Sequence, residues 1–292
     1  MGNRVSGQQT IDYRLSTKTK FIWVFVSLWS MVYSPWSCDA AERIVSLNAC
    51  TDELLLQLAE PNQIAGVTRF ELSPKSKELL IQNPKIMRLP SDIESLIKAQ
   101  PSVVLAGPFS NASLVDQLKK FGVTVSMVNV PKNWDELFEV SSQIVSFTNQ
   151  SKKLEAFKRA IEELKQISQT SKWKGKTAVF WSAAGHVSGL GTFEDTILST
   201  LGMKNGVQFE GYAFLSLEKL IQLQPDVIVV TQKAGRKDSW AHDTLFHPAL
   251  KKALPNLEYL QIPEGAASCA SGHTVEVLRN ILAGSVPSAA RD

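Results

Sequence analysis

Two stretches that lie far apart in this chain are similar in sequence, and this duplication constrains the fold more than any other feature. The first is Glu94–Ala106 (ESLIKAQPSVVLA) and the second is Glu218–Val230 (EKLIQLQPDVIVV). Each predicts a short amphipathic helix that stops near a proline, followed by a buried strand rich in β-branched residues. Because one copy falls in each half of the chain, we expect two similar lobes.

Between the two copies lies Asn149–Ser171, which predicts one long helix. Its apolar residues recur at steps of three and four and so share one face, whereas charged residues fill the other. These apolar residues are Leu154, Phe157, Ile161, Leu164 and Ile167. About 20 residues rising 1.5 Å each give a rod of roughly 30 Å. An ordinary surface helix has the same pattern, but similar halves on both sides favour a stiff connector between lobes.

Strands alternate with helices in both halves, which predicts an α/β fold with helices on both faces of each sheet. We therefore expect two similar lobes with mainly parallel sheets, joined by one long rigid helix, with a ligand cleft between the lobes. The expected limits are 41–148 for the N-terminal lobe, 149–172 for the linking helix and 173–292 for the C-terminal lobe. Expected loops include Ser182–Gly191 and Gly265–Gly272.

The first 40 residues are typical of an export signal. Basic residues precede the apolar run Phe21–Tyr33, which is shorter than the roughly 20 residues of a membrane span. Pro35 ends the run, and Cys38 and Ala40 are the small residues that a signal peptidase requires. We expect cleavage after Ala40, with an uncleaved anchor as the alternative.

The overall composition favours a globular protein with a substantial core, since 44% of the residues are hydrophobic and 20% are charged. The net charge of +3 is small, and no basic run is interleaved with aromatic residues. Nucleic acid is therefore not an expected partner.

Bulky aromatic residues occur just after several expected strands. They are Phe70, Phe109, Trp134, Trp181 and Tyr212. Since α/β sheets bind ligands at the carboxyl ends of their strands, we expect these rings to line a shared cleft. The alternative is that each ring covers local core. A set of such rings suits a large, flat, partly apolar ligand.

No enzyme signature stands out in the sequence. His186, His242, His247 and His273 lack the spacing of metal ligands, so we expect no metal site, no cofactor and no catalysis. The alternative is an exported thiol-dependent enzyme with Cys269 as nucleophile and His273 as base.

The chain resembles the helical-backbone class of periplasmic substrate-binding proteins, which serve ABC importers of vitamin B12 and ferric siderophores. The motifs that carry the resemblance are Arg43–Glu53 (RIVSLNACTDE), the two duplicated stretches, Gly191–Asp195 (GTFED) and His247–Leu250 (HPAL). The resemblance implies a periplasmic, monomeric protein that holds a metal chelate of the cobalamin or ferric siderophore type between its lobes. It also implies delivery of that ligand to an importer permease in the inner membrane.

Ligand-binding residues are expected around this cleft. The candidates are Cys50, Thr51, Arg69, Phe109, Trp134, Trp181, His186, Tyr212 and Cys269. Five basic residues either meet an anionic chelate or are solvated: Arg69, Arg88, Lys132, Lys233 and Arg236.

Two glutamates open the duplicated helices at equivalent positions. By the resemblance, Glu94 and Glu218 dock onto arginines of the permease, one from each lobe. The alternative is that each is an acid favoured by the positive end of its helix, a contribution of at most about 1 kcal/mol.

After signal cleavage Cys50 and Cys269 are the remaining cysteines, one in each half. Each comes directly before an expected helix, so both are expected to face the cleft. A disulfide requires Cα atoms within about 7 Å, which a cleft open enough for a macrocycle disfavours. We therefore predict two free thiols in the ligand-bound protein, with a bridge in the empty protein as the alternative.

Overall fold

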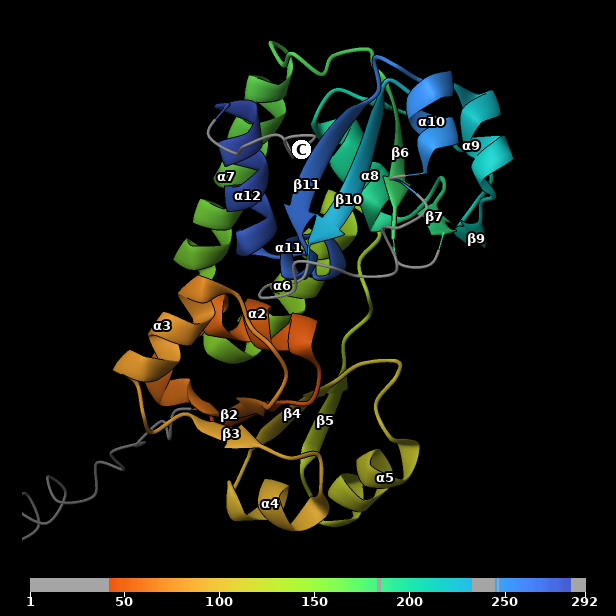
Figure 1. The fold of residues 1–292 in the computed structure, drawn as a ribbon. Helices are drawn as coiled ribbons and strands as arrows, with labels where there is room; N and C mark the ends of the chain where they lie inside the picture. Colours follow the sequence, from red (N-terminus) through yellow and green to blue (C-terminus); the bar gives the residue numbers. More distant parts are fainter. Residues whose placement is uncertain (1–41, 183–184, 233–244, 246, 285–292) are drawn as a thin grey trace, which may run out of the picture. The chain divides into compact units, whose positions relative to one another are not determined.

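The computed structural model describes residues 42–182, 185–232, 245 and 247–284, and within them two β-sheets, one in each half of the chain (Figure 1). The expected signal peptide, Lys233, Arg236 and His242 lie outside the described residues. None of the helices in the described part combines the length and the apolar character that crossing a bilayer requires.

The first sheet consists of five parallel strands in the order β3-β2-β1-β4-β5. The strands are β1 (Ile44–Ser46), β2 (Ile64–Thr68), β3 (Met87–Leu89), β4 (Val103–Ala106) and β5 (Thr124–Met127). The inner strands β1, β2 and β4 are wholly buried, as expected for a parallel sheet covered on both faces. Its outer helices are α3 (Pro74–Gln82), α4 (Ile93–Lys98) and α5 (Ala112–Lys120). This sheet and its helices are called the first lobe.

The second sheet is mixed and runs in the order β11-β10-β6-β7-β9, with β8 also paired to β6. Four strands pair in parallel: β6 (Thr177–Trp181), β8 (Lys204–Asn205), β10 (Val227–Gln232) and β11 (Glu258–Pro263). β7 (His186–Ser188) and β9 (Tyr212–Phe214) pair antiparallel. The expected loop Ser182–Gly191 therefore contains a strand, because the chain turns back beside β6. This sheet and its helices form the second lobe.

The helices of the second lobe are α8 (Phe193–Thr200), α9 (Leu217–Leu223), α10 (Pro248–Ala253), α11 (Glu264–Ser268) and α12 (Gly272–Leu282). The expectation of a loop at Gly265–Gly272 is wrong for its first part, where α11 forms. This short helix begins after Pro263, has Glu264 in its first turn, and buries Ala266 and Ala267. The two alanines are too small to signal an apolar face in the sequence.

Three helices lie between the sheets: α2 (Ala49–Leu58), α6 (Trp134–Thr148) and α7 (Ser151–Ser168) (Figure 1). The single-turn 3-10 helix η1 (Pro61–Gln63) follows α2. The expected linking helix is present as α7, but α6 precedes it directly and also connects the lobes. Asn149 separates the two helices, since it adopts a left-handed conformation at φ 55° and its N–H donates to the Val145 carbonyl.

The apolar face of α7 is confirmed over most of its length. Leu154, Phe157, Ile161 and Leu164 are buried against its neighbours. Ile167 is 39% exposed, contrary to the expectation, and Ser168 takes the buried position at the end of the helix. The helix makes contacts with α2 and α6 on one side and with α8 and α12 on the other.

One hydrophobic core runs through both lobes. It joins Ile44 of β1 and Leu55 of α2 to Ile144 of α6, and continues to Phe180 of β6 and Leu278 of α12. Full burial of such side chains stabilises a fold by roughly 1.5–3 kcal/mol each. The expected two-lobed α/β architecture is thus confirmed, with the lobes fused by packed side chains as well as by α7.

Candidate functional site

A cavity of about 800 Å³ lies between the two lobes. The order of the first sheet reverses between β1 and β4, so the chain leaves these neighbouring strands in opposite directions. Such a switch point leaves a crevice at the carboxyl ends of the strands. Asn48 follows β1, Pro108 follows β4, and both line the cavity. The second lobe contributes Leu190–Thr196 and Glu210–Tyr212 to the opposite wall.

Three helices begin at this cavity, and each has its own capping side chain. The Asn48 side chain accepts hydrogen bonds from the N–H groups of Cys50 and Thr51 at the start of α2. In α6 the Asn133 side chain accepts from its third N–H, and in α8 the Thr192 hydroxyl does the same. The caps occupy backbone donors that an anionic ligand group would otherwise use.

Carboxylates are the most frequent charged groups on the cavity wall. They belong to Glu136, Glu194, Asp195 and Glu210. Among the described residues Lys132 is the one cation on this wall. Glu136 accepts hydrogen bonds from the Lys132 N–H at 2.8 Å and from the Asn133 amide at 3.0 Å.

Glu194 and Tyr212 form a hydrogen-bonded pair across the second lobe's part of the wall. The Tyr212 hydroxyl donates to Glu194 Oε2 at 2.9 Å. Burial raises the pKa of the Glu194 carboxyl above its usual value, while hydrogen bonds from its own N–H and from Tyr212 act in the opposite direction. Burial and the neighbouring Glu194 charge raise the pKa of Tyr212, so its hydroxyl stays protonated. The Tyr212 hydroxyl therefore keeps its proton directed at Glu194, and the residue stays exposed on the cavity wall.

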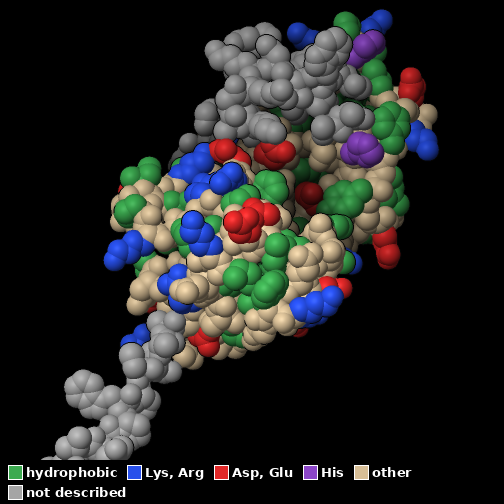
Figure 2. Space-filling view, turned by 90° about the horizontal axis from the view of Figure 1, so that it is seen from below, with side chains coloured by type: hydrophobic (Ala, Val, Ile, Leu, Met, Phe, Trp, Pro, Cys, Tyr) green, Lys and Arg blue, Asp and Glu red, His purple; other side chains and the backbone are tan. Residues whose placement is uncertain are grey.

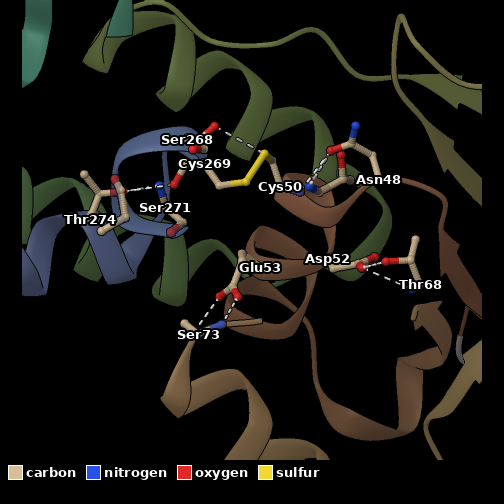
Figure 3. The surroundings of a disulfide bond; sticks show 12 residues. Asn48, Cys50, Asp52, Glu53, Thr68, Ser73, Ser268, Cys269, Ser271 and Thr274 are labelled. Atoms are coloured by element: carbon tan, nitrogen blue, oxygen red, sulfur yellow. Dashed lines mark hydrogen bonds between the residues drawn. A yellow bond between two sulfur atoms is a disulfide. The ribbon is translucent and has the colours of Figure 1, made fainter. Parts of the chain in front are cut away.

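Cys50 and Cys269 form a disulfide (Figure 3), the alternative expected for the empty protein, and their expected wide separation is wrong. Their Cα atoms are 4.8 Å apart, because the start of α2 packs directly against the segment that leads into α12. The expected wide separation assumed that the cleft continues between these helix starts. Instead they meet at one wall of the cavity, which Cys50 and Ser268 line.

The bridge joins the two lobes and has a second contact beside it. The N–H of Gly272, at the start of α12, donates to the Gln57 side chain of α2 at 2.9 Å. A Cβ atom at Gly272 would lie 2.5 Å from that side-chain oxygen, so glycine permits this close approach. The lobes are thus held together on this side of the cavity.

Three of the expected ligand-binding residues are placed at the cavity. Cys50, Thr51 and Tyr212 line its wall, whereas Cys269 lies between the lining residues Ser268 and Ala270. Thr51 is buried and Tyr212 is 65% exposed.

Trp134 and Trp181 are in the core rather than on the cavity wall. Trp134 is the first residue of α6, where its indole N–H donates to Thr200 at 2.8 Å and its ring meets Phe193 edge-on at 5.3 Å. Trp181 is completely buried at the end of β6. These two rings therefore cover local core, as the alternative interpretation of the sequence expected.

Arg69, Phe109 and His186 do not line the cavity either. Arg69 and Phe109 are exposed on the first lobe, and the guanidinium of Arg69 donates to the Arg88 carbonyl. His186 is exposed on β7, with its ring 6.4 Å from that of Phe214. Phe70 is also exposed and away from the cavity wall.

Sequence reasoning overlooked the acids and caps of this site. Glu136, Glu194 and Asp195 are first-turn acids, and Asn133 and Thr192 are their N-caps. The signal in the sequence was a cap residue followed within three positions by an acid, which marks a helix start. This pattern indicates a binding site only when the fold brings two such helix starts together.

The bridge also removes the chemistry of the enzymatic alternative. Nucleophilic catalysis by Cys269 requires a thiolate, which a disulfide sulfur cannot supply. Within the described part of the chain, no group of three or more His, Cys, Asp or Glu side chains is arranged to hold a metal ion.

Glu94 and Glu218 occupy the same position of matching helices. Each is exposed and is the second residue of its helix, after the N-caps Asp92 in α4 and Ser216 in α9. Hydrogen bonds from its own N–H and from the Ser216 side chain lower the pKa of Glu218. The duplication found in the sequence is thus reproduced in the structure.

A protein-family model described as periplasmic binding protein matches residues 44–252. The uncharacterized ABC transporter substrate-binding lipoprotein YvrC of Bacillus subtilis (strain 168) is 25% identical over 217 residues, which cover 68% of each chain. A cobalamin-binding protein of Halobacterium salinarum is 22% identical over 212 residues, 68% of this chain and 56% of that protein. The Fe(3+)-citrate-binding protein YfmC of Bacillus subtilis is 23% identical, over 53% of this chain and 52% of its own. The chain thus spans just over half the length of the last two relatives.

Solved structures share the fold. The periplasmic heme-binding protein HutB of Vibrio cholerae superposes with a TM-score of 0.68 at 20% identity, covering 85% of this chain and all of that one. The periplasmic vitamin B12-binding protein BtuF of Vibrio cholerae gives 0.62 at 16% identity, covering 83% and 96%. At these identities the likeness concerns the fold alone.

Proposed function

The chain belongs to the periplasmic binding protein family, whose model matches residues 44–252, and on that premise we propose that it is the substrate-binding component of an ABC importer. It captures a metal-chelate ligand in the cavity between the lobes and delivers it to a permease in the inner membrane. The observation that carries this proposal is the cavity of about 800 Å³, whose walls come from both lobes.

The size and setting of the cavity suit capture of a whole small molecule. Ligand pockets commonly measure about 300–1,000 Å³, and they occur at domain interfaces and switch points of α/β sheets. Here a shared core and a disulfide hold the lobes in place. A pocket that is already formed costs little conformational entropy when the ligand enters.

The named relatives support the class of ligand. Cobalamin, ferric citrate and heme, which appear in the names of the similar proteins, are all organic complexes of a metal ion. The ring of Tyr212 and the apolar side chains of Leu54, Val128 and Phe193 on the cavity wall suit the organic part of such a complex.

Docking to the permease is assigned to Glu94 and Glu218. The two side chains are exposed at equivalent positions of the two lobes, which matches the pairing that a two-fold permease surface needs. Export is assigned to residues 1–40, whose basic and apolar pattern is that of a cleaved signal peptide, so the mature protein acts in the periplasm.

A binding titration tests the proposal. The chain from Ala41 onwards is titrated with cobalamin, heme, ferric citrate and a ferric trihydroxamate, and tryptophan fluorescence is recorded. We expect at least one of these to quench the fluorescence with a Kd below about 10 μM, which corresponds to roughly 7 kcal/mol. If none binds in this range, the assigned ligand class is wrong.

A further inference from the structure

The charge of the cavity wall indicates which metal complexes the site accepts. Four carboxylates face a single lysine among the described lining residues, so this wall is net negative. Figure 2 shows acidic side chains interspersed with basic ones on the face that it draws. Several common chelates, ferric citrate and heme among them, carry carboxylates of their own and would meet like charges there.

The hydrogen-bond partners of these carboxylates are neutral groups rather than cations. Glu136 accepts from a backbone N–H and an amide, and Glu194 accepts from a tyrosine hydroxyl. Asp195 accepts from the Asn205 amide at 3.0 Å and from the Gly191 N–H at 3.3 Å. None of the ion pairs within the described residues includes a carboxylate of this wall.

Helix dipoles do not reverse this balance. The starts of α2, α6 and α8 each contribute about half a positive charge at most, which together is smaller than the net negative charge of the wall. Their caps Asn48, Asn133 and Thr192 also occupy backbone donors that an anion would need. Residues 233–244 lie outside the described part of the chain, and their sequence has three basic and two acidic residues. Adding all of these charges to those of the wall would still leave its net charge negative.

We propose that the cavity selects metal complexes with a net positive charge over neutral ones, and neutral over anionic ones. This inference rests on the proposed function, since it specifies the ligand class of the same site. An opposite charge at close range favours binding, whereas a like charge buried beside carboxylates weakens it.

A series of complexes that share one chelating skeleton and differ in net charge tests the inference. A linear ferric trihydroxamate with a free terminal amine is cationic, its N-acetyl derivative is neutral, and its N-succinyl derivative is anionic. Aquacobalamin and cyanocobalamin form a second pair, cationic and neutral. At low ionic strength we expect the cationic member to bind at least tenfold more tightly than the anionic one, with the ratio shrinking as salt screens the charges.

Charge reversal at the cavity supplies the matched variants. Glu210 lines the cavity, is exposed, and makes no hydrogen bond or ion pair through its side chain with the described residues, so Glu210→Lys should fold normally. It should weaken the cationic complex several-fold and strengthen the anionic one. Asp116→Lys, at an exposed position of α5 that does not line the cavity, should change neither. Lys132→Gln should shift both affinities in the direction opposite to Glu210→Lys.

The outcomes separate this inference from the proposed function. Equal affinity across each charge series, or tighter binding of anionic complexes such as heme or ferric citrate, overturns the inference and leaves the proposed function standing. Binding of no complex in either experiment overturns the proposed function and the inference together. The charge order in the wild type, with a smaller difference in Glu210→Lys and no change in the control variant, supports the inference.

Discussion

At the scale of single residues, Asp52 is an ionisable side chain in a fully buried position. It lies in the first turn of α2 and is completely buried, and Oδ2 accepts from the N–H and hydroxyl of Thr68. The other oxygen, Oδ1, is buried without a hydrogen-bond partner. Burial raises the pKa of Asp52 to about 7, although the hydrogen bonds from Thr68 partly oppose the shift.

This shift predicts a pH-dependent effect of Asp52→Asn. Between about pH 4 and pH 7 the folded protein holds a proton that the unfolded chain has lost, so the free energy of unfolding falls as pH rises through this window. The asparagine variant does not titrate. Its stability relative to the wild type should therefore rise by a few kcal/mol between pH 4 and pH 8.

Urea unfolding of both proteins at pH 4, 5.5 and 8 measures this difference. Asp116→Asn, a change of an exposed carboxylate on α5, is the control and should show little dependence. A constant difference between wild type and Asp52→Asn across the range would mean that Asp52 is ionised throughout.

Tyr212 carries a second prediction at this scale. Tyr212→Phe retains the ring but loses the bond to Glu194, whereas Tyr212→Ala also loses the contact area. For a bound corrinoid or trihydroxamate we expect about a tenfold loss of affinity in the alanine variant and a smaller loss in the phenylalanine variant, since an aromatic contact contributes roughly 1 kcal/mol or more. Equal losses would indicate that the hydroxyl, and not the ring, meets the ligand.

Among secondary-structure elements, the duplicated helices α4 and α9 are expected to act as a pair. Ala replacements of Glu94 and Glu218 should leave ligand affinity unchanged, because neither residue lines the cavity. Association with the permease should weaken for each single variant and further for the double variant, and its salt dependence should fall. Ligand uptake by cells that carry the double variant checks this. Unchanged uptake would mean that neither residue docks onto the permease and that both are only acids favoured at the start of a helix.

Most elements could be predicted from the sequence, because their hydrophobic period is local information. The strand Thr177–Trp181 and the buried face of α7 were expected and are present. Helix α6 was missed, so Trp134 was interpreted as a loop residue. Whether a ring that follows a strand points to the cavity or to the core depends on which element packs against it. For Trp134 that element is α8, whose Thr200 lies 66 residues farther on and is not visible in any local pattern.

At the scale of the whole molecule, the Cys50–Cys269 bridge closes a loop with a sequence separation of 219 residues. In the chain-entropy description, closing so long a loop destabilises the unfolded state by about 5 kcal/mol, and measured effects are typically about 2–4. The two cysteines and the oxidising compartment could be predicted from the sequence, but the distance between the cysteines depends on how the lobes pack.

Intact-mass measurement after alkylation decides the state of these cysteines. The chain from Ala41 onwards should take up no alkylating group before reduction and two after it. The double variant Cys50→Ser, Cys269→Ser should unfold at a lower temperature and keep its ligand affinity, because the shared core still holds the lobes. Uptake of two alkylating groups without reduction would mean that Cys50 and Cys269 are free thiols.

The central claim is that the space between the lobes holds the ligand, and calorimetry on a cavity-filling variant tests it most directly. Ser268 is exposed on the cavity wall, and Ser146 is exposed on α6 away from it, so Ser268→Trp and Ser146→Trp form a matched pair. With aquacobalamin and the cationic trihydroxamate as probes, the wild type should bind at least one of them at one ligand per chain. Ser146→Trp should bind equally well and Ser268→Trp at least tenfold more weakly. Equal affinity in both variants, or no binding by the wild type, would contradict the account.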